Sequence, residues 1–239
     1  MTQSVTTAYL TEILDDARSR TLELLDGLDA EQLIGPKLDI VNPMQWEIGH
    51  VAWFYEYFIL RRLYGHQPLL ARGDDLYDSI KIAHDTRWDL PLLSLEDTLD
   101  YMERVKAALI ERLHGTMADE TDSFIYRFAT FHEDMHDEAF LWTRQTLAYP
   151  RPALNVAKEG LPPDAEAGAL HGDVEVPGGT FWRGSPPNAP FLFDNEKWAY
   201  PVTLSPFRIA RAPVTNADFQ AFVADGGYQR REFWDDQGW

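Results

Sequence analysis

The chain has 239 residues, of which 45% are hydrophobic and 13% aromatic, so it can bury a sizeable core. Its formal net charge of −18 argues against nucleic acid and anionic membranes as partners, because both are bound by clustered Lys and Arg. The chain has no cysteine, which excludes disulfides, thiolate nucleophiles, iron–sulfur clusters and cysteine-ligated zinc. Any metal must therefore be held by His, Asp, Glu or backbone oxygen.

The N-terminal segment does not have the pattern of a targeting signal. It lacks a charged region followed by an apolar one, as a signal peptide would have. No stretch of the sequence approaches the roughly 18–20 apolar residues that a membrane helix needs. We therefore expect a cytoplasmic protein that does not interact with membranes.

The N-terminal part carries apolar residues at helical spacing. Ser94 is expected to cap the third helix, because acidic residues follow it in the first turn. Four such helices indicate an up-and-down bundle, with an ordered connection over 65–93. The predicted helices cover about 7–28, 43–64, 94–113 and 121–147.

The pattern changes after Tyr149. Prolines among Ala and Gly predict a linker, and strand-like alternation follows over 174–182 and 200–209. A short helix is expected at 216–224. We therefore predict an α+β protein. Its predicted organisation is a helical bundle over 1–150, a linker over 151–173 and the N-terminal part of a second domain over 174–239.

Three histidines on the inner faces of the predicted helices form a candidate metal site. His132 and His136 lie four residues apart, so both imidazoles share one face of the fourth helix. His50 lies on the apolar face of the second helix, beside Trp46 and Trp53. A single histidine on such a face is more often a hydrogen-bonded core residue. The combination instead predicts a three-histidine site with open positions, suited by ligand type to Fe, Zn, Ni or Co.

Four carboxylates surround the histidine pair in the sequence. They are most simply interpreted as charges on the helix surface. Alternatively, they orient the imidazole N–H groups, or one of them completes a site of two histidines and one carboxylate. The four are Glu133, Asp134, Asp137 and Glu138.

On these residues, the chain resembles the EgtB-like, iron-dependent sulfoxide synthases of ergothioneine biosynthesis and the related selenoneine synthases. The first part resembles a DinB-type bundle, whose ligand pattern of one His on the second helix and a later His-x-x-x-His matches His50, His132 and His136. The second part resembles the start of a formylglycine-generating-enzyme (sulfatase-modifying-factor) domain, which has an irregular C-type-lectin-like fold. The matching stretches are VPGGTFWRGS (176–185), 193–228 and FWDDQGW (233–239).

The resemblance implies an enzyme that uses Fe(II) and O2 to form a C–S or C–Se bond on the imidazole of hercynine. Its partners would be small molecules, namely hercynine, O2 and a thiol or selenosugar donor. A sulfatase-modifying-factor domain usually extends well beyond a stretch as short as 174–239. The resemblance therefore places the catalytic tyrosine and much of the hercynine pocket after Trp239, and the catalytic residues remain unknown.

Two departures from the family pattern concern the donor. In the branch that uses gamma-glutamylcysteine, two arginines three residues apart bind the donor; here the first aligns with Arg87 and the second with Leu90. A Gln commonly precedes the last iron-binding histidine, where this chain has Met135. A donor with fewer carboxylates fits one arginine better, and methionine suits a soft neighbour such as selenium. We therefore predict substrate-binding roles for Arg87 and Met135 and favour a selenosugar donor.

Two other functions are compatible with parts of the sequence. DinB-type bundles with the same three histidines also serve as zinc- or nickel-dependent thiol transferases, although those proteins are generally a bundle alone. Sulfatase-modifying-factor folds also occur as non-catalytic ligand-binding modules. In that case the three histidines would be incidental.

Overall fold

The computed structural model describes residues 4–155 and 170–239, which form two compact units. The first unit comprises the described residues up to 155 together with Pro187–Asp194. The second comprises 170–186 and Asn195–Trp239. Most of the predicted linker over 151–173 lies outside the described residues.

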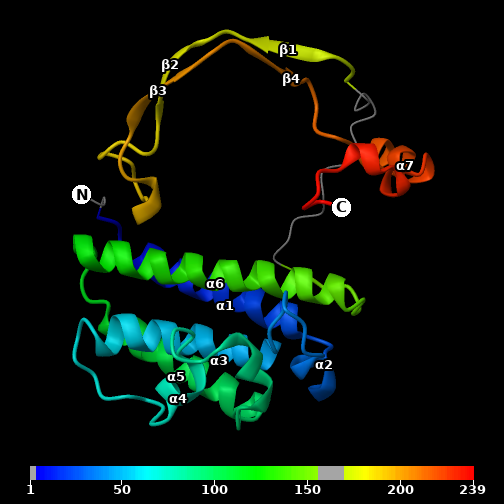
Figure 1. Ribbon diagram of the computed structural model, residues 1–239. Coiled ribbons are helices and arrows are strands. Elements are labelled where there is room, and N and C mark those ends of the chain that lie inside the picture. Colours follow the sequence, from blue (N-terminus) through cyan, green and yellow to red (C-terminus); the bar gives the residue numbers. More distant parts are fainter. Residues whose placement is uncertain (1–3, 156–169) are drawn as a thin grey trace. The chain divides into compact units, whose positions relative to one another are not determined.

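The first unit is a bundle of four long helices (Figure 1). α1 packs along α6, while α3 contacts both α5 and α6. The four predicted helices are confirmed, and with the small strands of the second unit they give the expected α+β class. The helices of this unit are α1 (Thr7–Leu25), α2 (Ala30–Ile34), α3 (Met44–Tyr55), the π-helix η1 (Glu56–Arg61), α4 (Gly73–Tyr77), the 3-10 helix η2 (His84–Asp89), α5 (Leu95–Arg112) and α6 (Glu120–Thr146).

The helix boundaries follow from local capping. Thr6, Ser94 and Asp119 each accept a hydrogen bond from a backbone N–H in the first turn of the helix that follows. These bonds satisfy donors that a helix start leaves unpaired. α1, α5 and α6 are amphipathic, whereas α3 is buried over almost its whole circumference. α3 is therefore the central helix of the bundle.

α3 continues directly into the wider turn of η1. Arg62 N donates to Tyr57 O at 2.9 Å, the i→i+5 spacing of a π-helix. Glu56, at the start of this turn, is fully buried. It accepts hydrogen bonds from Leu69 N and from the Tyr101 hydroxyl. The turn is thus fixed to the connecting segment and to α5.

The connection between η1 and α5 is ordered, as the sequence predicted. Trp46 Nε1 donates to Leu76 O at 2.7 Å, and Tyr77 is completely buried. A Cβ atom at Gly49 would lie 2.2 Å from the Tyr77 ring, so only glycine allows this approach. The connection is thereby held against α3 one residue from His50.

The second unit contains two antiparallel strand pairs and one α-helix. The predicted stretches 174–182 and 200–209 each divide into two strands, at Pro177–Gly178 and Ser205–Pro206. A capping box between Thr215 and Asp218 begins the helix. Its elements are β1 (Asp173–Val176) paired with β4 (Phe207–Ala210), β2 (Gly179–Arg183) paired with β3 (Tyr200–Leu204), α7 (Asn216–Ala224), and the 3-10 helices η3 (Asp194–Glu196), η4 (Gly227–Gln229) and η5 (Arg231–Phe233).

No helix in the described part of the chain has the length and apolar character needed to cross a membrane.

Candidate metal centre

The three predicted histidines meet where α3 packs against α6. One potential ligand atom from each of His50, His132 and His136 lies within 4.8 Å of the other two. The ring centroids are separated by 5.2 Å between His50 and His132, 5.1 Å between His50 and His136, and 4.7 Å between His132 and His136. His50 therefore meets a histidine pair that begins 82 residues later in the chain, as expected from the helical faces on which the three lie.

His50 is held in one orientation by its surroundings. Its Nδ1 lies 2.7 Å from the carbonyl oxygen of Tyr77, which can only accept a hydrogen bond. The neutral ring therefore carries its proton on Nδ1 and presents the Nε2 lone pair. Trp46 stacks on the imidazole at 4.9 Å with an interplanar angle of 9°. The hydrogen bond and the stacking together fix the plane of the ring.

The electrostatic environment keeps the imidazoles of His50 and His132 neutral. Burial, followed by the neighbouring His136, lowers the pKa of His50 to about 3. Burial, followed by His136 and His50, lowers the pKa of His132 to about 2. A metal binds the neutral imidazole, so the protein does not have to release protons from these two rings before binding at neutral pH.

An apolar cavity of about 120 Å³ adjoins the histidines. Its wall is mainly aromatic, while Asp78 and Ser79 contribute polar groups. Within this wall the Trp53 and Tyr57 rings are stacked, with 4.9 Å between their centroids. The cavity is lined by His50, His132, Trp53, Phe54, Tyr57, Phe58, Asp78, Ser79 and Ile80.

The donor set fits a bound metal ion. The Nδ1 atoms of His132 and His136 are buried and make no hydrogen bond to the described residues. Buried ring nitrogens without a partner are costly in a core, so their presence here favours a ligand. Within the part of the chain that the structure describes, the three histidines are the only cluster of three metal-ligating side chains. No carboxylate of α6 joins it.

A buried carboxylate that the sequence analysis missed lies behind His136. Glu47 Oε2 is 3.7 Å from His136 Nδ1. Its other oxygen accepts a hydrogen bond of 2.7 Å from Asn42 Nδ2, and Asn42 Oδ1 accepts one of 2.7 Å from Arg87 Nη1. The available signal was a single acidic residue within the apolar stretch MQWEIGHVAWFY, three positions before His50.

Arg87 lies at the end of this chain of contacts. Its guanidinium carbon is 3.9 Å from the centroid of the Trp46 ring, which itself stacks on His50. Burial lowers the pKa of Arg87. Among the described residues no carboxylate is within ion-pair distance of it, and Nε has no hydrogen-bond partner. Arg87 therefore contacts the site through Trp46 and Asn42, while Leu90 is only partly buried.

Met135 has a different environment from the histidines on either side. Its side chain is 55% exposed, on the turn of α6 between His132 and His136. It is absent from the lining of the cavity beside the histidines. Its predicted contact with substrate stays a prediction.

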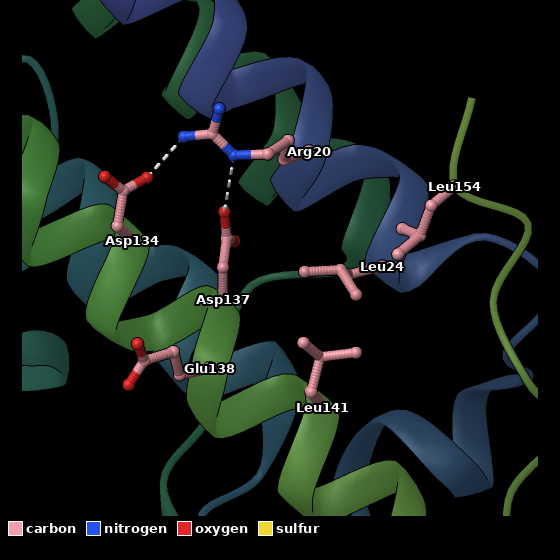
Figure 2. Close-up of a pocket in the computed structure, with 7 residues that line it drawn as sticks. All are labelled: Arg20, Leu24, Asp134, Asp137, Glu138, Leu141 and Leu154. Carbon is pink, nitrogen blue, oxygen red and sulfur yellow. Dashed lines mark hydrogen bonds and ion pairs between the residues drawn. The ribbon is translucent and has the colours of Figure 1, made fainter. Parts of the chain in front are cut away.

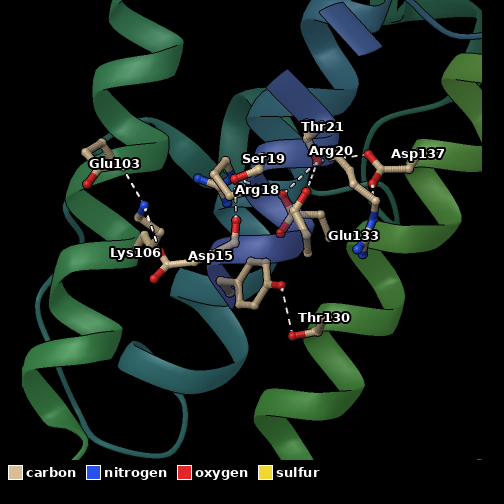
Figure 3. Close-up of polar contacts among 12 residues, drawn as sticks. Asp15, Arg18, Ser19, Arg20, Thr21, Glu103, Lys106, Thr130, Glu133 and Asp137 are labelled. Atoms are coloured by element: carbon tan, nitrogen blue, oxygen red, sulfur yellow. Dashed lines mark hydrogen bonds and ion pairs between the residues drawn. The ribbon is translucent and has the colours of Figure 1, made fainter. Parts of the chain in front are cut away.

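Two of the four carboxylates near the histidines are buried, so the expectation of surface charges is wrong for Glu133 and Asp137. Glu133 Oε1 accepts hydrogen bonds of 2.9 Å from Arg18 Nε and from Thr21 Oγ1 (Figure 3). Thr21 Oγ1 also lies 2.8 Å from Asp137 Oδ1. Burial raises the pKa of Asp137 to about 7. These groups join α6 to α1 on the side away from the histidines.

The other two carboxylates line a groove between α1 and α6. Arg20 pairs with Asp134 and lies 3.8 Å from Asp137 across this groove (Figure 2). Leu24, Leu141 and Leu154 form its apolar end, and its volume is about 370 Å³. The groove contains none of the three histidines.

Comparison with known proteins assigns both parts of the sequence. The DinB superfamily pattern matches residues 13–140, and that of the sulfatase-modifying factor enzyme 1-like domain matches 158–239. Hercynine oxygenase of Mycolicibacterium smegmatis is 34% identical over 227 residues, and that of Mycolicibacterium thermoresistibile is 35% identical over 236 residues. These alignments cover 93% and 97% of this chain but 52% of each relative. The chain thus spans about half the length of the curated relatives it matches.

A shorter similarity covers the second part of the sequence. Formylglycine-generating enzyme of Streptomyces coelicolor is 38% identical over 82 residues, which are 34% of this chain and 25% of the relative. The two parts together have the EgtB-like arrangement that the sequence motifs indicated.

Proposed function

The chain belongs to the DinB superfamily and has the EgtB-like arrangement of domains, and on that premise we propose that it serves a non-haem Fe(II)- and O2-dependent oxygenase acting on hercynine. The reaction would form a carbon–sulfur or carbon–selenium bond on the imidazole ring. The observation that carries this proposal is the convergence of three imidazoles, one buried and two half-buried, beside an aromatic cavity. The similarity to hercynine oxygenases over most of the chain supports the choice of substrate.

We propose His50, His132 and His136 as the iron ligands. When bound there, Fe(II) would supply open coordination positions at which O2 and the chalcogen donor are brought together. The protein holds the ligands ready through particular contacts. Tyr77 O fixes the tautomer of His50, and the buried carboxylate of Glu47 lies 3.7 Å from Nδ1 of His136.

The aromatic wall beside the ligands has its own role. Trp53, Phe54 and Tyr57 give the cavity beside His50 and His132 an aromatic lining. In such surroundings charges interact more strongly than in water. Asp78 is a buried carboxylate at the same cavity and can orient a cationic or hydrogen-bonding part of a substrate.

For the donor we propose a small molecule with at most one carboxylate, and we favour a selenosugar over gamma-glutamylcysteine. Arg87 is the one arginine of the family pair present, since the second position is Leu90. A second donor carboxylate buried without a cation would lose several kcal/mol of hydration. Met135 would provide a soft contact to substrate. Replacing Arg87 with Leu should weaken donor affinity while iron binding is kept; unchanged kinetics would remove Arg87 from the donor site.

The function is tested by anaerobic Fe(II) reconstitution of the full-length protein. Hercynine, O2 and each candidate donor are then added, and products are identified by mass spectrometry. A hercynine-derived C–Se or C–S product supports the proposal, and a higher turnover with gamma-glutamylcysteine than with a selenosugar rejects the donor assignment. Oxygen uptake without a hercynine product would contradict the proposed substrate.

A second candidate rests on the same three imidazoles, which also suit zinc or nickel. A DinB-type thiol transferase would use such a metal without oxygen. Metal analysis of the protein purified from its source, together with an oxygen electrode, separates the two. Zinc or nickel at one equivalent, with thiol transfer and no oxygen uptake, would favour the transferase.

A further inference from the structure

Eight residues from the sulfatase-modifying-factor part of the sequence belong to the helical unit. Pro187–Asp194 lies within the 158–239 match, yet it packs as part of the first unit. Its Leu192 is only 6% exposed. The carbonyl of Pro190 accepts a hydrogen bond of 3.1 Å from Nη1 of Arg127, a residue of α6. We refer to Pro187–Asp194 as the docking segment.

Aromatic rings fix the docking segment on α6. Phe191 contacts Phe124 at 5.4 Å and Phe131 at 4.9 Å between ring centroids. Phe193 contacts Phe131 at 5.9 Å and Phe128 at 6.0 Å. These distances lie in the range of attractive aromatic pairs. The segment therefore binds the turns of α6 that lead directly to the proposed ligand His132.

A continuous series of rings joins the docking segment to that ligand. Phe128, against which Phe193 packs, contacts Phe54 of α3 at 5.9 Å. Phe54 in turn lies parallel to the His132 imidazole, at 3.7 Å between centroids with an interplanar angle of 13°. Phe193 is thus connected to His132 through two intervening rings, Phe128 and Phe54.

His132 depends on this packing more than His50 does. His50 is oriented by a hydrogen bond from Nδ1 to the Tyr77 carbonyl. The Nδ1 of His132 is buried and has no hydrogen-bond partner in the described part of the chain. The plane of the His132 ring is therefore set by stacking on Phe54, whose other neighbours include Phe128.

We propose that Phe193 is a positioning residue for the metal centre, so that docking of 187–194 on α6 and metal binding at His132 stabilise each other. The inference rests on the proposed metal site. Coupling between two binding events is reciprocal. Loss of docking must therefore lower the affinity for the metal, and bound metal must shift the docking equilibrium toward the docked state by the same factor. In this way a segment of the second domain's sequence would tune a site in the first.

The forward test uses the full chain and Co(II) as the probe, since Co(II) reports its coordination by absorption. Phe193→Ala should weaken Co(II) affinity by about 3- to 10-fold, the usual effect of one aromatic pair, and alter the visible bands. Phe193→Leu, which keeps apolar bulk, should restore part of the affinity. Phe222→Ala is the matched control, because Phe222 packs only among rings of the second unit in the described structure. It should leave both affinity and spectrum unchanged.

The reverse test uses hydrogen exchange on the wild-type chain. Co(II) should slow exchange of the amides in 187–194 by the factor measured in the forward test, and His132→Ala should abolish this protection. Because this experiment compares the wild-type chain with and without Co(II), it still tests the coupling if Phe193→Ala does not fold. If wild-type protein binds no Co(II), the metal site itself is rejected. If it binds Co(II) but Phe193→Ala binds equally well with the same spectrum, or if 187–194 gains no protection, the coupling is rejected.

Discussion

The two sides of α6 carry polar groups of different kinds, imidazoles on one and ion-paired carboxylates on the other. Toward α3, His132 and His136 lie among aromatic rings, and their Nδ1 atoms make no hydrogen bond to the described residues. Toward α1, one residue further along in each case, Glu133 and Asp137 each have one oxygen held by Arg18 or Thr21, while the other oxygen has no hydrogen-bond partner among the described residues. Polar groups paired within the protein fix the helix, whereas polar groups left with free lone pairs are available to a ligand.

This division has a mechanical consequence. A metal ligand must be held within a fraction of an ångström of its working position, and this requires a rigid support. The buried Arg18–Glu133 pair at 2.9 Å provides that support one residue from His132. The comparison therefore predicts that changes on the α3 side remove the metal, while changes on the α1 side mainly reduce stability.

The largest effect is expected from the ligands. His50→Ala, His132→Ala or His136→Ala should each remove bound iron while leaving the helical circular dichroism nearly unchanged, because the core forms without these rings. Iron is measured by elemental analysis after anaerobic reconstitution. Stoichiometric iron in any one variant would exclude that histidine as a ligand.

On the opposite side, Arg18→Ala should lower the free energy of unfolding by about 3–5 kcal/mol, because it leaves the Glu133 carboxylate buried without its cation. Urea unfolding measures this change. Arg104→Ala is the control, since its pair with Asp100 is exposed and should contribute about 0.2–1 kcal/mol. Equal losses in both variants would mean that the buried pair is no more important than a surface pair.

The two sides should also respond oppositely to pH in the metal-free protein. His50 and His132 have pKa values of about 3 and 2, below the unfolded value, so the unfolded chain binds more protons below about pH 6.5 and stability falls with acidification. Asp137 has a pKa of about 7, above its unfolded value, so it lowers stability as pH rises from about 4 through 7. The two histidines contribute about 2.7 kcal/mol per pH unit and Asp137 opposes them with about 1.4, so a metal-free net slope of about 1.4 kcal/mol per pH unit is expected between about pH 4 and 6.5.

Unfolding in chelator at several pH values measures this slope. His132→Phe should reduce it, and Asp137→Asn should raise stability most above pH 7. A wild-type slope that neither substitution changes would contradict the assignment of these groups.

The smallest of these effects is expected at Glu47. Glu47→Gln should weaken metal affinity by about 10- to 100-fold, the usual loss when a group behind a histidine ligand is changed. Glu138→Gln is a suitable control, because Glu138 lines the groove toward α1. A Co(II) titration compares the two variants. If both behave as wild type, the 3.7 Å approach of Glu47 to His136 has no role in metal binding.

Sequence patterns predicted what depends on neighbours along the chain. Helical spacing and the Ser94 cap located the long helices, and the faces of those helices brought His50 to His132 and His136. The burial of Glu133 could not be predicted, because its partner Arg18 is 115 residues away. Nothing in the periodicity around Phe193 indicates that it packs on a helix that ends at Thr146. The π-helix after Tyr55 also has no signature in the apolar pattern.

The docking segment also has a consequence for the order in which the protein can fold during synthesis. The bundle helices are complete once α6 has left the ribosome, but Phe124, Phe128 and Phe131 then lack the rings of 187–194 that cover them. At about 5–20 residues per second, the chain from Leu147 to Asp194 takes about 2–10 s to make. During that interval the nascent bundle exposes these aromatic rings, and exposed apolar surface of this kind favours aggregation. Maturation of the half that carries the three histidines is thus timed by synthesis of the half that follows it.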